Sequence, residues 1–387
     1  MHKPHMHMSL HFESLRLAAT PVLFAIACLS SFVEPQPMQA QQGLPSRSPA
    51  SDTITWHMVS DWGVEGRPWS DVNRFYDRLP GRAESIVRSQ VWSLSRHSAG
   101  MSCRFVTDAP EVQIRYTLLL PDLALPHMPA TGVSGTDMYT LSATGEWRWI
   151  ATLLPRETRV FGSLIRGMES GKRTYMLHLP LYNGIDSLEI GVTMGAFFEP
   201  VPPRTEKPIV FYGTSIMQGG CASRPGMAIP AIIGRRMDIP VVNLGFSGNG
   251  RMEPEIAHLL AELDPAVYVI DCLPNLTVQQ TAERTEPFVR ILREARPSTP
   301  ILLVEDRVSP NAFALPDKMR EHRDRHAALR TTFEKLQTAG MKELYYLEGE
   351  KLLGEDGEAT VDGSHPTDLG MLRYATSYER ALRTILR

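Results

Sequence analysis

Three side chains of chemically useful types stand at two turns of the chain. Ser215 follows the apolar run 208–212, while Asp362 and His365 lie three residues apart near the C-terminus. A serine beside a histidine that a carboxylate orients can perform nucleophilic catalysis. The imidazole takes the hydroxyl proton, and the carboxylate fixes the imidazole tautomer. The spacing therefore indicates a catalytic serine with its base and the group that orients the base.

Each half of this pattern also has a plainer explanation. Ser215 could cap the helix that follows it, a common role for serine. In the turn Asp362-Gly363-Ser364-His365-Pro366, Ser364 could cap the last helix, with Pro366 in its first turn and His365 exposed. The two turns lie at opposite ends of a segment in which strands and helices alternate, and their joint presence favours the catalytic interpretation.

Two further turns lie between them. The run 241–245 is a second apolar strand, and it enters a glycine-rich turn that contains Gly248. The run 267–271 is a third strand, which is followed by Asn275. A backbone N–H could be exposed at the glycine-rich turn, and the third strand ends at an asparagine.

Together the four segments resemble the sequence blocks of the SGNH (GDSL-type) hydrolases, over residues 208–387. The resemblance implies that Ser215 is the nucleophile, His365 the base and Asp362 its partner. It also implies an oxyanion hole formed by Ser215, Gly248 and Asn275, with no metal and no cofactor. Two blocks depart from the family pattern: Gly213-Thr214-Ser215 stands for Gly-Asp-Ser, and Leu273-Pro274-Asn275-Leu276 for Gly-x-Asn-Asp.

The elements that must position these residues form an α/β pattern. The expected strands are 208–212, 240–244, 266–271, 300–305 and 343–347, and the expected helices are 227–237, 253–263, 278–295, 318–339 and 368 to the C-terminus. Such alternation predicts a flavodoxin-like parallel sheet in three layers, with Ser215 and Asn275 at one crevice. The G-x-S-x-G turn of the α/β-hydrolases is excluded because residue 217 is Met.

Residues 52–200 have a different texture, which predicts an all-β sandwich or jelly roll. Short alternating runs occur at 91–94, 103–106, 112–116, 147–150, 175–179 and 187–192. The motifs Gly135-Thr136-Asp137-Met138-Tyr139 and 179–184 resemble those of the β module that precedes some carbohydrate-active SGNH enzymes. Residues 201–207 are proline-rich and predict a short hinge before the hydrolase domain, 208–387.

Several other residues invite a functional interpretation, and a structural role is the simpler expectation for each. All six tryptophans (Trp56, Trp62, Trp69, Trp92, Trp147, Trp149) fall in the β half, where packing is favoured over a sugar platform. Asp137, Tyr139 and Asn183 are expected to be strand and turn fixtures. Glu305, Asp306 and Arg307 are expected to form a local salt bridge, and His258, His322 and His326 to lie on the surface. Arg224 is close enough to Ser215 in sequence to contact substrate.

The N-terminus predicts export. A mostly apolar stretch, 17–33, is followed by small residues up to Ala40, typical of a signal peptide over residues 1–40 with a linker at 41–51. The expected location is secreted or periplasmic, and a lipid anchor on Cys28 is disfavoured. Of the three remaining cysteines, Cys221 and Cys272 are expected near one sheet edge, either bridged or as buried thiols.

Composition limits the partners. The chain has 387 residues, 43% of them hydrophobic, and a net charge of only −3, so it can bury a large core in two domains. The small net charge gives no indication of nucleic acid, and no stable membrane span is expected. The substrate is expected to be a small-molecule or glycan ester, with acetyl on a carbohydrate favoured. A lipid or thioester hydrolase, or a non-catalytic glycan-binding protein, is the alternative, and the oligomeric state stays open.

Overall fold

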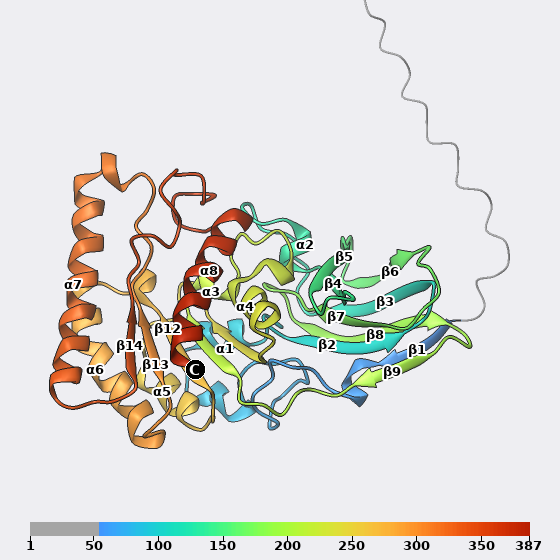
Figure 1. Cartoon of the computed structure of the whole chain (residues 1–387), viewed down its shortest axis with the longest axis horizontal. Coiled ribbons are helices and arrows are strands. Elements are labelled where there is room, and N and C mark those ends of the chain that lie inside the picture. The colour runs from blue at the N-terminus through green and yellow to red at the C-terminus, as the bar shows by residue number, and fades with distance from the viewer. Residues whose placement is uncertain (1–53) are drawn as a thin grey trace, which may run out of the picture. The chain divides into compact units, whose positions relative to one another are not determined.

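The first half of the chain is a sandwich of two antiparallel sheets, as the sequence predicted (Figure 1). The computed structural model describes residues 54–387, so the predicted signal peptide and linker lie outside the described residues. The four-stranded sheet runs in the order β1 (Ile54–Met58), β8 (Ile185–Thr193), β3 (Glu111–Leu118), β6 (Arg159–Arg166). The five-stranded sheet runs in the order β5 (Trp147–Leu153), β4 (Thr136–Leu141), β7 (Arg173–His178), β2 (Ser102–Thr107), β9 (Phe198–Val201).

Alternation along the strands explains the sandwich. In β3, Val112, Ile114 and Tyr116 are buried, whereas Arg115 between them is exposed. The apolar face of each sheet therefore has to be covered, and the two inner faces cover one another. Phe105 of β2 stacks on Tyr175 of β7 in this core, with ring centroids 5.3 Å apart.

One predicted strand is wrong. Residues 91–94 lie in helix α1 (Ser89–Ser95), and the other short helix of this half is α2 (Ala130–Val133). Val91, Trp92 and Ser95 of α1 are buried, which is the spacing of a helix face. Four residues cannot distinguish a period of two from one of 3.6, and here packing against the second half decides.

The second half contains the predicted parallel sheet, and its strand order is flavodoxin-like. The order is β11 (Val241–Gly245), β10 (Ile209–Gly213), β12 (Val267–Asp271), β13 (Ile301–Val304), β14 (Leu344–Leu347). Because β10 lies between β11 and β12, the residues that follow these three strands meet at one edge of the sheet.

Helices cover both faces of this sheet, which explains why its strands are apolar throughout. The helices are α3 (Ser215–Gln218), α4 (Ile229–Met237), α5 (Pro254–Ala261), α6 (Val278–Ala295), α7 (Pro316–Thr338) and α8 (Asp368–Ile385). In β10, Val210 and Tyr212 join the core under α5, α6 and α7, while Ile209 and Phe211 join the core under α3, α4 and α8. No helix within residues 54–387 has the length and apolar character needed to cross a bilayer.

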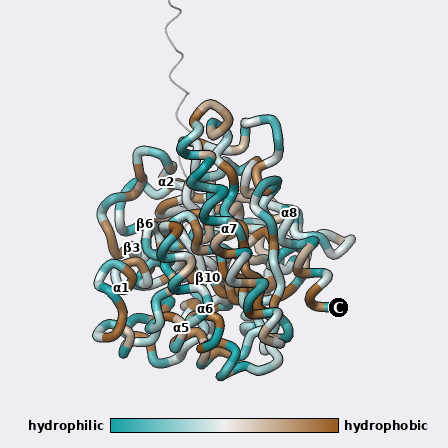
Figure 2. Tube along the Cα trace, turned by 90° about the vertical axis from the view of Figure 1, so that its left-hand side faces the viewer, coloured by the Kyte–Doolittle hydropathy of each residue, from teal (hydrophilic) through white to brown (hydrophobic). Residues whose placement is uncertain are grey.

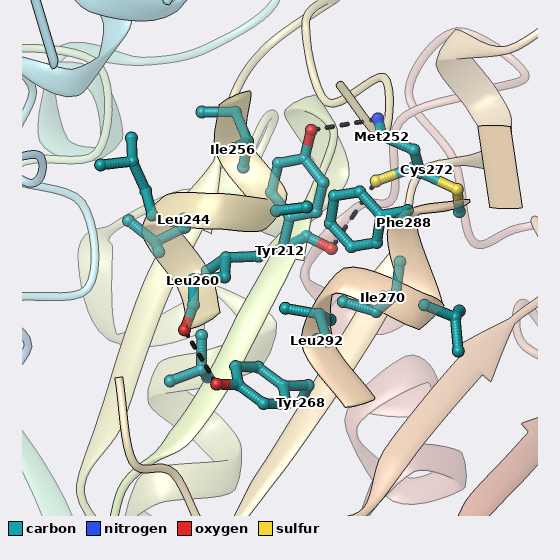
Figure 3. Close-up of a cluster of buried hydrophobic side chains, with 14 of the residues drawn as sticks. Tyr212, Leu244, Met252, Ile256, Leu260, Tyr268, Ile270, Cys272, Phe288 and Leu292 are labelled. Atoms are coloured by element: carbon teal, nitrogen blue, oxygen red, sulfur yellow. Dashed lines mark hydrogen bonds between the residues drawn. The ribbon is translucent and has the colours of Figure 1, made fainter. Parts of the chain in front are cut away.

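Tyrosines in the first of these cores are anchored as well as buried (Figure 3). Tyr212 stacks on Phe288 of α6, with ring centroids 5.4 Å apart. The Tyr212 hydroxyl accepts hydrogen bonds from the N–H groups of Arg251 and Met252, each at 3.1 Å. Helix α7, on the outside of this core, is largely hydrophilic in Figure 2. Through these contacts of Tyr212, the core extends from α6 to the turn that follows β11.

Part of the segment before β2 packs against the second half. Trp69, Leu79, Val91 and Trp92 pack in the core shared with α5 and α6. The side chain of Arg78 is fully buried and donates to carbonyl oxygens on both sides: His97 (2.9 Å), Leu94 (2.6 Å), Asn243 (3.0 Å) and Gly245 (2.8 Å). Packing rather than sugar binding therefore accounts for Trp69 and Trp92.

Candidate active site

Ser215 is the first residue of α3, directly after β10, and its hydroxyl is not the helix cap. Thr214 is the N-cap residue, and its hydroxyl accepts from the N–H of Ile216 at 3.3 Å. The plainer explanation for Ser215 is therefore wrong, because the neighbouring threonine has that role. Ser215 is 9% exposed, at the carboxyl edge of the parallel sheet.

The structure brings the predicted serine, histidine and aspartate together. Ser215 Oγ lies 2.8 Å from Nε2 of His365, and Nδ1 of His365 lies 2.8 Å from Oδ2 of Asp362. The other oxygen of Asp362 accepts from the N–H groups of Ser364 (2.9 Å) and His365 (2.7 Å). With its proton on Nδ1, the imidazole presents a free lone pair to the hydroxyl, which is the arrangement of a general base.

The Asp362 carboxylate is held in its ionised form. Burial raises its pKa, but hydrogen bonds from the His365 backbone, the His365 imidazole and the Ser364 backbone outweigh burial and lower the pKa to about 2. Ser364 does not cap the last helix; Thr367 does, accepting from the N–H of Gly370. The plainer explanation for this turn is therefore also wrong.

The predicted oxyanion donors lie on the two neighbouring turns. Gly248 has a φ of +69°, which a glycine adopts without strain, in the turn after β11. That turn is joined to β10 by a hydrogen bond from the N–H of Phe246 to the carbonyl of Gly213 (2.9 Å). Gly250 must be a glycine, because a Cβ there would lie 2.0 Å from the same carbonyl oxygen. Within the described part of the chain, neither the N–H of Ser215 nor that of Gly248 donates to a protein acceptor.

Asn275 ends the short turn after β12, and its surroundings assign the orientation of its amide. With Oδ1 facing the N–H groups of Asn249 (3.0 Å) and Gly250 (3.2 Å), both contacts pair a donor with an acceptor. In that orientation both contacts with the glycine turn go through Oδ1, and Nδ2 is the donor end of the amide. Asn275 thus holds the glycine turn through its oxygen.

Three residues that the sequence did not indicate support this site through hydrogen bonds: Gln218, His97 and Tyr182. Gln218 is buried: its Oε1 accepts from the N–H of Ser247 (3.0 Å), and its Nε2 lies 3.1 Å from Nδ1 of His97. Burial, assisted by the charge of Arg78, lowers the pKa of His97 to about 3, so this ring stays neutral and can accept. The hydroxyl of Tyr182 donates to the carbonyl of Ser215 at 3.2 Å.

One missed residue from the first half lies beside the base. His127 is exposed at the turn between Leu125 and Met128, and its ring centroid is 5.8 Å from that of His365. Met128 is buried in the core under α4 and α8, so this turn is anchored to the second half. A lone exposed histidine gives no sequence signal for this placement.

The Asp137 motif joins the two halves. Asp137 is fully buried, forms a salt bridge with Arg224 (2.5 Å) and accepts from the N–H of Gly226 at 2.8 Å. Tyr139 contacts the same arginine. The expected fixture role of Asp137 is therefore confirmed, and it also fastens the segment that follows α3. Asn183 likewise bonds the backbone of Leu120, at 3.0 Å through both ends of its amide.

The expected surface positions of two histidines need correction. His322 is 2% exposed and His326 is half-buried, both against Asp306, so only His258 of the three lies on the surface. The sequence does not show that His322 and His326 lie on the inner side of α7, because that helix is mostly polar.

Cys221 and Cys272 are free, as is Cys103, and all three are buried. Of the two alternatives for Cys221 and Cys272, the buried thiols are the correct one.

Comparisons with known proteins identify the family to which both halves of the chain are similar. Residues 206–383 match the GDSL-like lipase/acylhydrolase family, and residues 54–198 match the N-terminus of SGNH-hydrolase-type esterases. A crystal structure from Bacteroides ovatus ATCC 8483, of a protein assigned to the GDSL-like lipases, is 31% identical, with a TM-score of 0.82 over 86% of this chain and 98% of that one. This chain belongs to the GDSL-like lipase/acylhydrolase family. It is accordingly a carboxylic ester hydrolase by family.

More distantly similar structures share the fold. The salicylyl-acyltransferase SsfX3 of a tetracycline biosynthetic pathway is 21% identical, with a TM-score of 0.66 over 87% of this chain and 96% of that one. A family two carbohydrate esterase from Cellvibrio japonicus is 14% identical, with a TM-score of 0.56 over 86% of this chain and 98% of that one. No curated protein was found to match the sequence. These more distant structures show the fold alone, because identities this low carry no substrate information.

Proposed function

We propose that this chain is an exported serine esterase that removes short acyl groups, acetyl above all, from a carbohydrate. The observation that carries the proposal is the continuous hydrogen-bonded series from Ser215 Oγ through the His365 imidazole to Asp362, with both links at 2.8 Å. This series lies at the carboxyl edge of a parallel sheet, beside the N–H groups of Ser215 and Gly248, which are unpaired among residues 54–387. It supplies the groups that acyl transfer requires.

The reaction proceeds in two steps. Ser215 Oγ attacks the ester carbonyl and passes its proton to Nε2 of His365. The oxyanion that forms is met by the N–H groups of Ser215 and Gly248 and by Nδ2 of Asn275. The C–O bond to the alcohol then breaks, and the alcohol takes the proton from the imidazolium. Water, deprotonated by His365, attacks the acyl-enzyme and releases the acid.

Polar surroundings favour a small acyl group and a polar alcohol. Polar side chains beside the site include His127, whose ring centroid is 5.8 Å from that of His365, and Tyr182, whose hydroxyl donates to the Ser215 carbonyl. Hydrogen-bonding groups of this kind suit a hydroxylated leaving group better than a long acyl chain, which requires an apolar trough. The two β-sheet motifs of the first half, which resemble those of the module before some carbohydrate-active SGNH enzymes, favour the same class of substrate.

The proposal is tested by hydrolysis of p-nitrophenyl acetate and octanoate and by acetate release from acetylated oligosaccharides. The acetate ester is expected to react faster than the octanoate. The Ser215→Ala variant is expected to lose nearly all turnover while keeping its fold, because only the reacting hydroxyl is removed. A serine-directed phosphonate should label Ser215. Label at another residue, or substantial activity in Ser215→Ala, would refute the assignment.

Export is tested separately from catalysis. Mass analysis of protein recovered from the native cells is expected to give a mature N-terminus near Gln41, after the Met38-Gln39-Ala40 site. Retention of residues 1–30 would remove export from the proposal and leave the esterase activity untouched.

A further inference from the structure

Arg307 contacts Ser364, one of the two residues between Asp362 and His365. Its Nε donates to the carbonyl oxygen of Ser364 at 3.1 Å, and its Nη2 donates to the Ser364 hydroxyl. Arg307 follows β13 and its side chain is only 5% exposed. Two donors on one planar guanidinium fix both the position and the orientation of what they hold.

Arg307 is itself held by a buried carboxylate. Asp306 is fully buried, and its Oδ2 accepts from Arg307 Nη1 (3.2 Å), Arg325 Nη2 (2.9 Å) and His322 Nδ1 (3.1 Å). Its Oδ1 lies 2.7 Å from Nε2 of His326. Because the partners other than Arg307 belong to α7, this set of contacts ties the end of β13 to a long helix on the sheet.

The same cluster could be mistaken for a metal site. The ligand atoms of Asp306, His322 and His326 all lie within 4.8 Å of one another. However, the guanidinium groups of Arg307 and Arg325 already contact Asp306, and Arg325 Nη2 lies 3.1 Å from Nδ1 of His322. A divalent ion would face both cations, so the cluster is an internal ion-pair network that anchors Arg307.

The turn that Arg307 holds requires an outside anchor. Asp362 fixes the internal geometry of the turn through its bonds to the N–H groups of Ser364 and His365. Those bonds do not relate the turn to Ser215, which lies on a different element. Arg307 supplies that relation, because β13 is joined through β12 to β10, the strand that ends before Ser215.

We propose that Arg307 is a positioning residue of the esterase. Its hydrogen bonds to Ser364 keep Asp362 and His365 aligned with Ser215. The contacts of Asp306 with Arg307 and with α7 keep Arg307 itself in place. This inference rests on the proposed function, since it assigns a role within the same site. Arg307 touches neither substrate nor the reacting atoms, and its effect passes through the turn.

The test compares kcat and KM for p-nitrophenyl acetate among variants. Arg307→Met is expected to lower kcat about a hundredfold, the loss that follows a displacement of about 1 Å in a catalytic group. KM should stay within roughly twofold, because the substrate contacts remain. Arg307→Lys should recover part of kcat through one remaining donor, and added guanidinium ion should raise kcat of Arg307→Ala. A merely structural loss would show neither recovery.

Ser364→Ala tests the same contact from the other side, on a turn residue whose loss leaves the core intact. It removes one of the two bonds, so we expect a smaller loss of kcat, about tenfold. The double variant Arg307→Met/Ser364→Ala should lose less than the product of the two single losses, because both changes break one interaction.

Arg373→Met is the matched control. Arg373 binds the carbonyl of Leu353 (2.9 Å) and the carboxylate of Asp356, on the same connection but away from the turn. Its kcat should equal that of the wild type. Wild-type kcat in both Arg307→Met and Ser364→Ala would overturn the positioning role while leaving the esterase intact. An inactive wild type, or an active Ser215→Ala, would instead refute the proposed function.

Discussion

Asn275 supplies the side-chain donor of the proposed oxyanion hole, and its loss should affect the transition state more than binding. Asn275→Ala is expected to lower kcat roughly a hundred- to a thousandfold, the usual loss for one such donor. KM for p-nitrophenyl acetate should change little, because the ground-state carbonyl carries little charge.

Thr277→Ala is the control for the Asn275 experiment. Thr277 caps α6 through a bond from the N–H of Gln280 at 3.1 Å, so its loss should cost about 1 kcal/mol of stability. Its kcat should stay at the wild-type value. A similar fall of kcat in both variants would mean that Asn275 acts through stability and not as a donor.

At the scale of single residues, the sequence was informative where chemistry restricts the residue type. The meeting of Ser215, Asp362 and His365 was predictable because few side-chain types suit the proposed roles of nucleophile, orienting acid and base. Ser215 also directly follows an apolar strand, and Asp362 and His365 precede the last helix. Gln218, His97 and Arg307 were not, because they act through partners far away in the chain: Gln218 and His97 are 121 residues apart, and Arg307 and Ser364 are 57 apart. Ordinary polar residues carry no mark of such a contact.

At the scale of elements, Tyr212 connects β10 to the turn that carries Gly248. Its hydroxyl accepts from the N–H of Met252 (Figure 3). It also accepts from the N–H of Arg251 and donates to the Glu253 carboxylate at 3.2 Å. Tyr212→Phe leaves two buried N–H groups without their acceptor, which should cost about 1–3 kcal/mol in the free energy of unfolding. Because these residues follow directly after Gly250, kcat should fall as well.

Tyr268→Phe is the matched control in the same core. The Tyr268 hydroxyl donates to the carbonyls of Leu260 (2.8 Å) and Leu263 (3.0 Å), at the far end of the cluster in Figure 3. Urea unfolding should show a comparable loss of stability, with kcat unchanged. Equal effects of the two variants on kcat would show that this core does not position the turn.

The predictability of the elements follows from how each is buried. The parallel strands are buried on both faces, so their apolar runs gave bounds within a residue of those observed at β10 and β11. Helix α1 was misread because four residues do not fix a period. The inner side of α7 was invisible because it buries His322 and Arg325 as an ion-pair network, where a hydrophobic stripe would have been recognised.

At the scale of the whole molecule, the sequence separates two architectures but does not reveal how they are joined. Residues 66–99 lie within the predicted β domain, yet Trp69 and Trp92 pack in the core of the second half. The segment expected to be a hinge is also fastened, since Arg204 forms a salt bridge with Glu65 at 2.8 Å. These contacts join residues that are far apart in the sequence and form only in the complete fold. No local sequence pattern therefore predicts them.

Arg78 is the side chain on which the packing of the two halves against each other depends most. Burial lowers its pKa to about 9, which leaves it a cation at neutral pH, and all four of its bonds go to carbonyl oxygens of the segment 94–97 and of β11. Arg78→Met should therefore lower the free energy of unfolding by at least about 3 kcal/mol, since bonds to a charged donor are lost and buried acceptors stay unpaired.

Lys207→Met is the control: it breaks an exposed pair with Asp264 and should lower the free energy of unfolding by at most about 1 kcal/mol. Urea unfolding should show one transition for the wild type, and limited proteolysis should cut at 201–207 readily only in Arg78→Met. A wild-type midpoint in Arg78→Met, or ready release of two stable halves from the wild type, would show that the halves do not depend on this contact.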